Sequence, residues 1–309
     1  MPRRVILDID PGVDDAFALC VALAEPAIEV VAVTATGGVV SPAQASLNVQ
    51  ALVERLDPPK WPRLGAADTN QLLRAEASHV HGPDGLAGAD LPVAEKAHQH
   101  ESVHLLCEEI RTHPDEITII STGPMSNIAT MLMREPDLVG SIGELVLLGG
   151  SIAAGGDATA AAEFNVYCNA MAAREVLAAR VTKTLVPLDV SGQLAFGYEL
   201  LDRVKSGDSR TSKLLASILP GYFHTQRQLF GYESARLGAV AAVLAVANPN
   251  LFSTDSMSVD VETAGELTHG VTVFDRRPTR TPQPNAEVAV DVDVERATAA
   301  VYDALQRAV

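Results

Sequence analysis

Four aspartates lie within residues 8–15, in the sequence DIDPGVDD. Asp8 and Asp10 share one face of a predicted strand, because side chains alternate along a strand. Gly12 allows the chain to fold one of the two later aspartates back toward them. Carboxylates this close raise each other's pKa unless a cation or a helix N-terminus compensates their charge. A bound divalent metal ion is the simplest compensation.

Oxygen ligands alone favour Ca²⁺ or Mg²⁺ over zinc, since no Cys or His stands near these aspartates in the sequence. Water that is held by such an ion and by a carboxylate base is a nucleophile near neutral pH. In a simpler alternative, Asp14 and Asp15 only cap the helix that follows and favour its dipole. The position of the other two aspartates at the end of a buried strand favours the metal site.

The elements that position these aspartates alternate along the chain between short apolar runs and helical patterns. The predicted strands cover residues 5–10, 28–34, 117–120, 145–148 and 184–188, and predicted helices cover 14–25, 102–111, 127–134 and 170–179. This alternation predicts parallel strands joined by crossover helices. Because several runs are apolar on both faces, helices should cover both sides of the sheet. The predicted fold is α/β, with a doubly wound, mostly parallel sheet of the Rossmann-like kind.

The C-terminal third of the chain adds a mainly helical segment over residues 198–247, with a long helix over 211–230. Strand-like runs follow at 258–262, 271–274 and 287–292, before a final helix that begins at Val294. No internal repeat and no domain boundary is visible in the sequence. We therefore expect residues 1–309 to form a single domain.

Ligands of such sheets bind beyond the carboxyl ends of the strands. Polar or small residues follow the apolar runs at those ends, namely Asp10, residues 36–38, residues 121–124, residues 149–151 and Asp189. We therefore expect several loops to converge on one crevice.

The composition excludes some kinds of partner. Asp and Glu number 39 against 23 Lys and Arg in 309 residues, a formal charge of −16, so nucleic acid is not an expected partner. The longest apolar stretch, residues 239–247, is too short to cross a membrane, and the N-terminus lacks the apolar stretch of a secretory signal. Cys20, Cys107 and Cys168 lie far apart, as buried thiols of a reducing compartment do. We expect a cytoplasmic protein.

Residues 6–19, ILDIDPGVDDAFAL, closely resemble the N-terminal signature of the inosine-uridine-preferring nucleoside hydrolase family. Members of this family hydrolyse the N-glycosidic bond of ribonucleosides. Further segments resemble family motifs in order and spacing: residues 81–86 the H-G-x-x-G-L loop, 121–129 the G-P-L-T-N-I-A turn and 162–165 the A-E-F-N segment. The resemblance runs from about residue 4 to 192 and continues more weakly to the end.

The resemblance implies a Ca²⁺ ion, with Mg²⁺ as the alternative, that binds the nucleophilic water and the ribose hydroxyls. By position, Asp10 and Asp15 resemble the metal ligands, with the backbone carbonyl of Thr122 as a third, and Asp10 also resembles the general base. The resemblance further implies a small-molecule nucleoside as substrate and a homo-oligomer, either a dimer or a tetramer.

The remaining roles that the resemblance implies concern the sugar. Asp14 would hold a ribose hydroxyl, while Glu163 and Asn165 would bind the 5′ and 3′ sides of the ribose. The transition state resembles a ribosyl oxocarbenium ion, which surrounding carboxylates stabilise. In the alternative, Glu163 and Asn165 simply belong to a polar turn before the next helix. A histidine inside such a glycine-rich loop more often lies in a turn or at the surface than in a catalytic site, so His81 is left out of the catalytic set.

The sequence departs from the family pattern at one helix start. Gly238 and Ala239 stand where family members usually carry His-Asp, so one carboxylate ligand and a histidine near the leaving base are absent. Gly38 and Asp157 each stand where the family commonly has Asn. Losing an anionic ligand lowers the affinity for a hard cation, and losing the histidine removes a leaving-group acid. The candidate replacements are Glu233 or Asp255 as a ligand, and Tyr222, His224, Arg227 or Tyr232 as a donor or stacking partner.

Three functions compete at this point. The leading hypothesis is a metal-dependent hydrolase that splits ribonucleosides, or a related ribosyl compound, into ribose and free base. The second is a ribose- or nucleoside-binding protein with little or no turnover, because of the residues at positions 38, 238 and 239. The third is a phosphatase of the haloacid dehalogenase type, in which Asp8 and Asp10 would form the Asp-x-Asp motif. The continuation of the sequence after Asp10 has no role in such a phosphatase.

Overall fold

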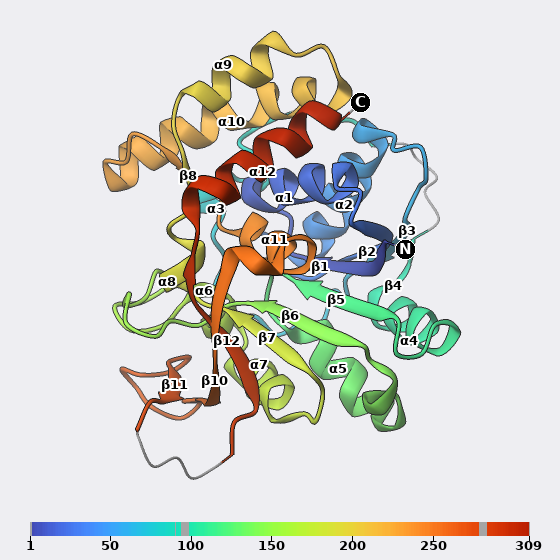
Figure 1. Cartoon of the computed structure of the whole chain (residues 1–309), viewed down its shortest axis with the longest axis vertical. Helices are drawn as coiled ribbons and strands as arrows, with labels where there is room; N and C mark the ends of the chain where they lie inside the picture. Colours follow the sequence, from blue (N-terminus) through green and yellow to red (C-terminus); the bar gives the residue numbers. More distant parts are fainter. Residues whose placement is uncertain (1, 90, 94–98, 278–282, 309) are drawn as a thin grey trace.

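Ten strands form one continuous sheet in the computed structural model, which describes residues 2–89, 91–93, 99–277 and 283–308 (Figure 1). Their order across the sheet is β11-β10-β12-β7-β6-β5-β1-β2-β3-β4. The strands are β1 (Arg3–Ile9), β2 (Ile28–Ala35), β3 (Arg63–Ala66), β4 (His100–Glu101), β5 (Ile117–Ser121), β6 (Glu144–Leu148), β7 (Lys183–Val186), β10 (Phe252–Val261), β11 (Thr272–Asp275) and β12 (Ala286–Val292). A separate antiparallel pair joins β8 (Ala195–Phe196) to β9 (Ala235–Arg236).

The sheet is parallel from β4 to β12, and only β10 and β11 at one edge run antiparallel to their neighbours. The prediction of a mostly parallel α/β sheet is confirmed. Asp8 of β1 pairs with Thr34 of β2 on one side and with Ser121 of β5 on the other. This register brings the carboxyl ends of the central strands to one edge, where the predicted polar loops begin.

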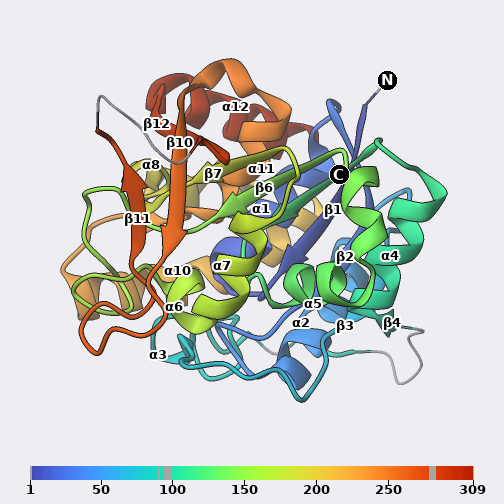
Figure 2. The ribbon, with the colours of Figure 1, turned by 90° about the horizontal axis from the view of Figure 1, so that it is seen from below.

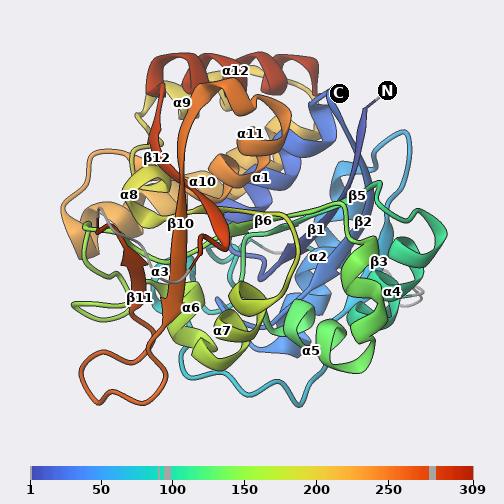
Figure 3. The ribbon, with the colours of Figure 1, turned by 60° about the horizontal axis from the view of Figure 1, so that its bottom comes forward.

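Helices cover both faces of the sheet, as the sequence predicts (Figures 2 and 3). Alternate residues of one strand enter different cores, so Val5 and Leu7 join one apolar cluster and Ile6 joins the other. The helices of the first face are α1 (Val13–Ala24), α2 (Pro42–Leu56), α10 (Arg210–Phe230), α11 (Ala239–Ala247) and α12 (Val294–Arg307). The helices of the second face are α4 (Ser102–Thr112), α5 (Ser126–Arg134) and α7 (Ala170–Ala178).

Shorter helices complete the described chain: α3 (Ser78–His81), α6 (Phe164–Cys168), α8 (Leu188–Ser191), α9 (Glu199–Ser206) and the 3₁₀ turns η1 (Pro136–Ser141) and η2 (Pro249–Leu251). The predicted helical segment over residues 198–247 is thus α9, α10 and α11, interrupted by β9. The helices α2 and α3 and the short strands β3 and β4 were not predicted. No helix in the described ranges is long and apolar enough to span a membrane.

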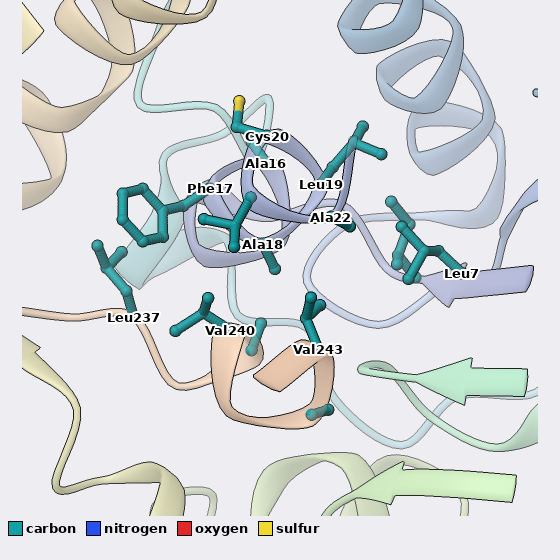
Figure 4. Packing of buried hydrophobic residues seen from close by; sticks show 14 of the residues in the cluster. Leu7, Ala16, Phe17, Ala18, Leu19, Cys20, Ala22, Leu237, Val240 and Val243 are labelled. Atoms are coloured by element: carbon teal, nitrogen blue, oxygen red, sulfur yellow. The ribbon is translucent and has the colours of Figure 1, made fainter. Parts of the chain in front are cut away.

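The helix α11 has the sequence AVAAVLAVA and is apolar around its whole circumference. Such a helix is stable only when it is buried on all sides. It packs against α1, where Val240 and Val243 lie close to the side chains of Phe17 and Ala18 (Figure 4). This packing brings the N-terminus of α11 to the start of α1, beside the aspartates. Both faces share one sheet, and we propose, as the sequence predicts, that residues 1–309 form one domain.

Candidate active site

Asp10 follows β1 directly and lies almost fully buried between two glycine loops. Its Oδ2 accepts a hydrogen bond from the backbone N–H of Val39 at 2.9 Å. A Cβ atom at Gly38 would lie 2.0 Å from Oδ2, and a Cβ atom at Gly123 would lie 2.5 Å from Oδ1. No larger residue fits at either position with Asp10 in this place. The glycine at 38, a departure from the family pattern, is therefore what lets this carboxylate rest against the loop after β2.

Asp15 lies in the first turn of α1 and is also buried. Its carboxylate accepts hydrogen bonds from the hydroxyl of Thr122 and, at 3.1 Å, from the backbone N–H of Gly12. Burial and the charge of Asp14 raise the pKa of Asp15 to about 7. Asp15 therefore caps the N-terminus of α1, as the simpler alternative predicts. Through its bond with Thr122 it also contacts the loop that follows β5.

Asp10 and Asp15 interact directly through their charges. Burial and the neighbouring charges of Asp15 and Asp14 raise the pKa of Asp10 well above its usual range. Positive charge would stabilise two buried carboxylates that interact in this way. The tertiary structure thus brings together the two side chains that the resemblance identifies as metal ligands.

Asp14 faces the start of α11, and its side chain is 22% exposed. Burial raises its pKa to about 6, while backbone hydrogen bonds, including one from Ala239, lower it. The missing His-Asp pair of the family would thus stand beside Asp14. In this chain the residue at 239 offers a backbone N–H and the helix dipole in place of a carboxylate.

Asp8 has a structural role. It is fully buried, and its Oδ1 accepts hydrogen bonds of 2.7 Å from Thr34 Oγ1 and from Asn127 Nδ2. Its Oδ2 has no partner among the described residues, and burial raises its pKa to about 6. Because solvent does not reach Asp8, it is not placed to attack a phosphate, which argues against the phosphatase hypothesis.

Glu163 and Asn165 lie at the start of the short helix α6, and their side chains form hydrogen bonds with backbone groups around it. The Glu163 carboxylate accepts three backbone N–H groups, from Gly150 at 2.9 Å, Asn165 at 2.9 Å and Val166 at 3.1 Å. Burial and the charge of Asp157 raise the pKa of Glu163 to about 8. Glu163 therefore caps α6, and the polar turn that the simpler alternative predicts is present.

Asn165 connects this helix to the metal-ligand candidates. Its Nδ2 donates to the carbonyl oxygen of Thr122 at 2.7 Å and to that of Leu148 at 3.1 Å. The polar turn and the sugar-binding role are therefore compatible, because the turn itself lies at the site. All six residues predicted for the site meet at the carboxyl edge of the sheet: Asp10, Asp14, Asp15, Thr122, Glu163 and Asn165.

Asp157 joins the site from the loop between β6 and α6. Its Oδ1 accepts the backbone N–H of Phe164 at 2.8 Å. Solvent reaches the residue, but the protein around the carboxylate desolvates it and raises its pKa. Its charge in turn raises the pKa of both Asp14 and Glu163. The carboxylate that replaces the family's Asn therefore lies among the sugar-binding candidates.

His81 lies at the site, which the sequence reasoning missed. It is only 8% exposed, and its ring stacks on Tyr222 with 5.2 Å between the ring centroids. Its Nδ1 accepts the backbone N–H of Val13 at 3.1 Å and lies 3.8 Å from Asp14 Oδ1. Burial lowers its pKa to about 4, so the ring is neutral. The expectation that His81 lies at the surface is wrong, because the residue is buried beside Asp14. The family motif at residues 81–86 was the sequence feature that could have placed it at the site.

Most of the candidate replacements lie elsewhere. Glu233 pairs with Arg227 on the surface, and Asp255 is exposed on β10. His224 is exposed as well. Tyr232 stacks on Phe230 and lies under the guanidinium of Arg236. Of these candidates, Tyr222 is the one that contacts a residue of the site.

The donor atoms fit a hard divalent cation. They are oxygens, and two of them belong to the buried carboxylates of Asp10 and Asp15, whose pKa values are both raised by burial and by neighbouring aspartate charges. Among the described residues, no three His, Cys, Asp or Glu side chains form a group that could hold a metal. Asp10 and Asp15 would therefore need the Thr122 carbonyl and solvent oxygens to complete a coordination sphere.

A doubly wound α/β sheet with buried carboxylates at its carboxyl edge is typical of enzymes that catalyse hydrolysis or group transfer. The model of the inosine-uridine preferring nucleoside hydrolase family matches residues 5–299, so the chain belongs to this family of N-glycosyl hydrolases. The resemblance of the motifs is thereby confirmed. The family is metal-dependent as a whole.

Curated relatives match nearly end to end. The chain is 35% identical over 297 residues to the pyrimidine-specific ribonucleoside hydrolase RihA of Salmonella choleraesuis (strain SC-B67), with 95% of each chain covered. It is 32% identical over 311 residues to the inosine-uridine preferring nucleoside hydrolase of Crithidia fasciculata, with 99% of this chain and 98% of the relative covered.

Solved structures agree with these matches. A plant nucleoside hydrolase superposes with a TM-score of 0.91 at 27% identity, covering 99% of both chains. A purine-preferring ribonucleoside hydrolase from Gardnerella vaginalis superposes with a TM-score of 0.91 at 25% identity, covering 98% of both. The fold that the sequence predicts is thus the fold of nucleoside hydrolases.

Proposed function

We propose that this chain hydrolyses the C1′–N bond of ribonucleosides to ribose and free base, with Asp10 as the general base. The observation that carries the proposal is the pair of buried carboxylates, Asp10 and Asp15, at the carboxyl edge of the sheet, where the charge of Asp15 raises the pKa of Asp10. We further propose Ca²⁺ as the metal, with Mg²⁺ as the alternative, held by these two side chains and the Thr122 carbonyl. Such an ion supplies positive charge that lowers the pKa of a bound water.

Asp10 accepts the proton of the attacking water in this proposal. Its Oδ2 is held by the Val39 N–H, and Gly38 and Gly123 close around the carboxylate. These contacts hold the base in one orientation. A base in a fixed position contributes on the order of 10² to 10⁴ in rate.

The sugar is bound by groups on the other side of the site. In this proposal the partly exposed carboxylate of Asp14 accepts a ribose hydroxyl. Glu163 and Asn165 also contact the sugar; the charge of Asp157 acts on both Asp14 and Glu163, in keeping with one common site. The C1′–N bond breaks with positive charge developing on the ribosyl ring. Nearby carboxylates stabilise that charge, and they need no rearrangement as it forms.

Ribose release measured with a panel of purine and pyrimidine ribonucleosides tests the proposal. We expect release with Ca²⁺ and its loss in EDTA, and the panel also identifies the preferred base. Calorimetry on the same nucleosides tests the alternative binding function, which Ala239 in place of the usual carboxylate favours. Tight binding with no ribose from any nucleoside would support a binding protein and contradict the hydrolase.

Two further features belong to the proposal. We propose a homo-oligomer, dimer or tetramer, because of the family resemblance, and light scattering coupled to gel filtration tests it. We also propose a cytoplasmic location. Cys20, Cys107 and Cys168 are all free and buried, in keeping with a reducing compartment.

A further inference from the structure

We propose that Gln71 is a positioning residue for the general base, because its side chain holds the loop after β2 in the conformation that orients the Asp10 carboxylate. The inference rests on the hydrolase function above and adds a residue from outside the motifs of that site. Gln71 is half-buried in the segment between β3 and α3. The contacts of its carboxamide, and of the segment around it, carry the proposal.

The loop over residues 36–40 holds Asp10 but has little rigidity of its own. The N–H of Val39 donates to Asp10 Oδ2 at 2.9 Å, and the backbone of Gly38 lies so close to this carboxylate that a Cβ atom has no room. Gly37 and Gly38 are consecutive glycines, and glycine has more backbone freedom than other residues. Contacts from outside the loop must therefore fix the position of the Val39 N–H.

The carboxamide of Gln71 supplies such a contact. Its Oε1 accepts the backbone N–H of Gly37 at 2.8 Å and the hydroxyl of Thr36 at 3.3 Å. The N–H of Thr36 still donates to the carbonyl oxygen of Ile9 on β1 at 2.9 Å. Gly37 is thus the first residue past β2 whose N–H depends on a side chain.

The other end of the Gln71 carboxamide is anchored to the sheet through Asn127. Gln71 Nε2 donates to Asn127 Oδ1 at 2.8 Å. Asn127 is buried, and its Nδ2 donates to Asp8 Oδ1 at 2.7 Å and to the carbonyl oxygen of Ala35 at 2.8 Å. Because both hydrogens of this amide are in use, Asn127 presents its oxygen to Gln71. The network therefore fixes which end of the Gln71 carboxamide faces Gly37.

The segment around Gln71 holds the same loop at two further points. The side chain of Leu73 covers Gly37, where a Cβ atom would lie 2.5 Å from Leu73 Cδ1. The N–H of Ala77 donates to the carbonyl oxygen of Val39 at 3.1 Å. One segment therefore fixes the loop on both sides of its second glycine, and the Gln71 carboxamide is the part of this segment that bonds the loop and the sheet together.

Loss of the Gln71 contacts should impair the chemical step more than substrate binding. Asp10 acts on the attacking water, whereas the proposed sugar contacts come from Asp14 and the start of α6. A base that is displaced from its productive orientation transfers the proton more slowly, while those sugar contacts persist. A residue that acted only in substrate binding would change KM instead.

Gln71→Met tests the role, because methionine has a similar length and makes neither hydrogen bond. At saturating Ca²⁺, kcat for ribose release from uridine and inosine should fall about tenfold, while KM changes less than about twofold. Gln99→Met is the matched control. Gln99 is also half-buried, but its Nε2 donates to the carbonyl oxygen of Ser46 on α2 at 2.8 Å. This variant should keep the wild-type kcat.

Hydrogen exchange of the backbone amides of residues 36–40 measures the tether independently of turnover, in protein without Ca²⁺ or nucleoside. Exchange should be about fivefold faster or more in Gln71→Met, because two hydrogen bonds to the loop are lost, and unchanged in Gln99→Met.

Three results would overturn the inference: a wild-type kcat in Gln71→Met, a loss that appears in KM alone, or exchange over residues 36–40 no faster than in Gln99→Met. Ribose release by the wild-type chain would still support the hydrolase function in each case. If the wild-type chain cleaves no ribonucleoside, the hydrolase function and the inference both fail.

Discussion

The hydroxyl of Thr122 donates a hydrogen bond to the carboxylate of Asp15, joining the loop after β5 to the first turn of α1. The carbonyl of the same threonine accepts a hydrogen bond from Asn165 at 2.7 Å. Thr122 therefore acts through its side chain as well as its backbone. The sequence assigns a role only to the carbonyl, because the position of the hydroxyl depends on how two distant segments meet.

Thr122→Val should destabilise the folded chain by about 1–3 kcal/mol at pH 8, because it removes a donor to a buried carboxylate. It should also raise the pKa of Asp15 further and weaken Ca²⁺ binding. Chemical denaturation and calorimetric Ca²⁺ titration measure the two effects. Thr122→Ser keeps the hydroxyl and should stay close to wild type on both; equal losses in the two variants would show that the hydroxyl contributes nothing.

Asp10→Asn should abolish ribose release, with a loss on the order of 10² to 10⁴ or more in kcat, while the fold persists. The amide oxygen can still accept the Val39 N–H, and one of two repelling charges is removed. We therefore expect the melting temperature in EDTA to stay the same or rise. Steady-state kinetics beside thermal melts separate the two effects, and full activity in this variant would contradict the assigned base.

The metal-free protein should lose stability as the pH rises from about 4 to about 8. Burial raises the pKa of Asp14 to about 6, of Asp15 to about 7 and of Glu163 to about 8. The folded chain thus binds more protons than the unfolded chain across this window. The stabilisation is fully present below the unfolded pKa values and is lost as the pH passes the folded ones, on the order of a few kcal/mol.

Melting curves in EDTA at about pH 5 and about pH 8 measure this loss. Excess Ca²⁺ should restore stability at the higher pH, because an ion that binds only the folded state stabilises it. The same effect of Ca²⁺ at both pH values would mean that these carboxylates do not bind the ion.

Ala239→Asp restores a carboxylate at the start of α11, next to Asp14. We expect Ca²⁺ affinity to rise about tenfold or more, since each anionic ligand strengthens binding of a hard cation. The metal-free protein should become less stable, because the new charge is added to an acidic region. Ala239→Asn has nearly the same shape without the charge, so it should reproduce neither change in calorimetry and melting.

Asn165→Asp should cost about 2–4 kcal/mol, because a carboxylate would face the carbonyl oxygens of Thr122 and Leu148 in a buried place. Asn169→Asp is the matched change nearby. Asn169 caps α7 through Oδ1, and Asp caps a helix equally well. Its Nδ2 donates to the Ser126 hydroxyl at 3.0 Å, and that hydroxyl can instead donate to an aspartate. Urea denaturation should therefore find the second variant near wild type, and similar losses in both would refute the specific role of the Asn165 amide.

Much of the fold could be predicted from the sequence because its signals are local. The runs at residues 117–120 and 145–148 are apolar on both faces, and they form the central strands β5 and β6 within one residue of the predicted limits. The helix predicted over 211–230 is α10 (Arg210–Phe230), which Ser209 caps through its hydroxyl. The strands β3 and β4 gave no comparable signal, since they are only four and two residues long.

The residues of the site were predictable by type and by motif, but their contacts were not. The sequence by itself determined an acidic turn after the first strand and the polar ends of the strands beside it, because side-chain alternation and strand direction are properties of short segments. Only the tertiary structure decided that Thr122 bonds Asp15, that His81 is buried beside Asp14, and that the N-terminus of α11 meets the same aspartate. These contacts join segments far apart along the chain, and the packing of the crossover helices on the sheet determines where those segments meet.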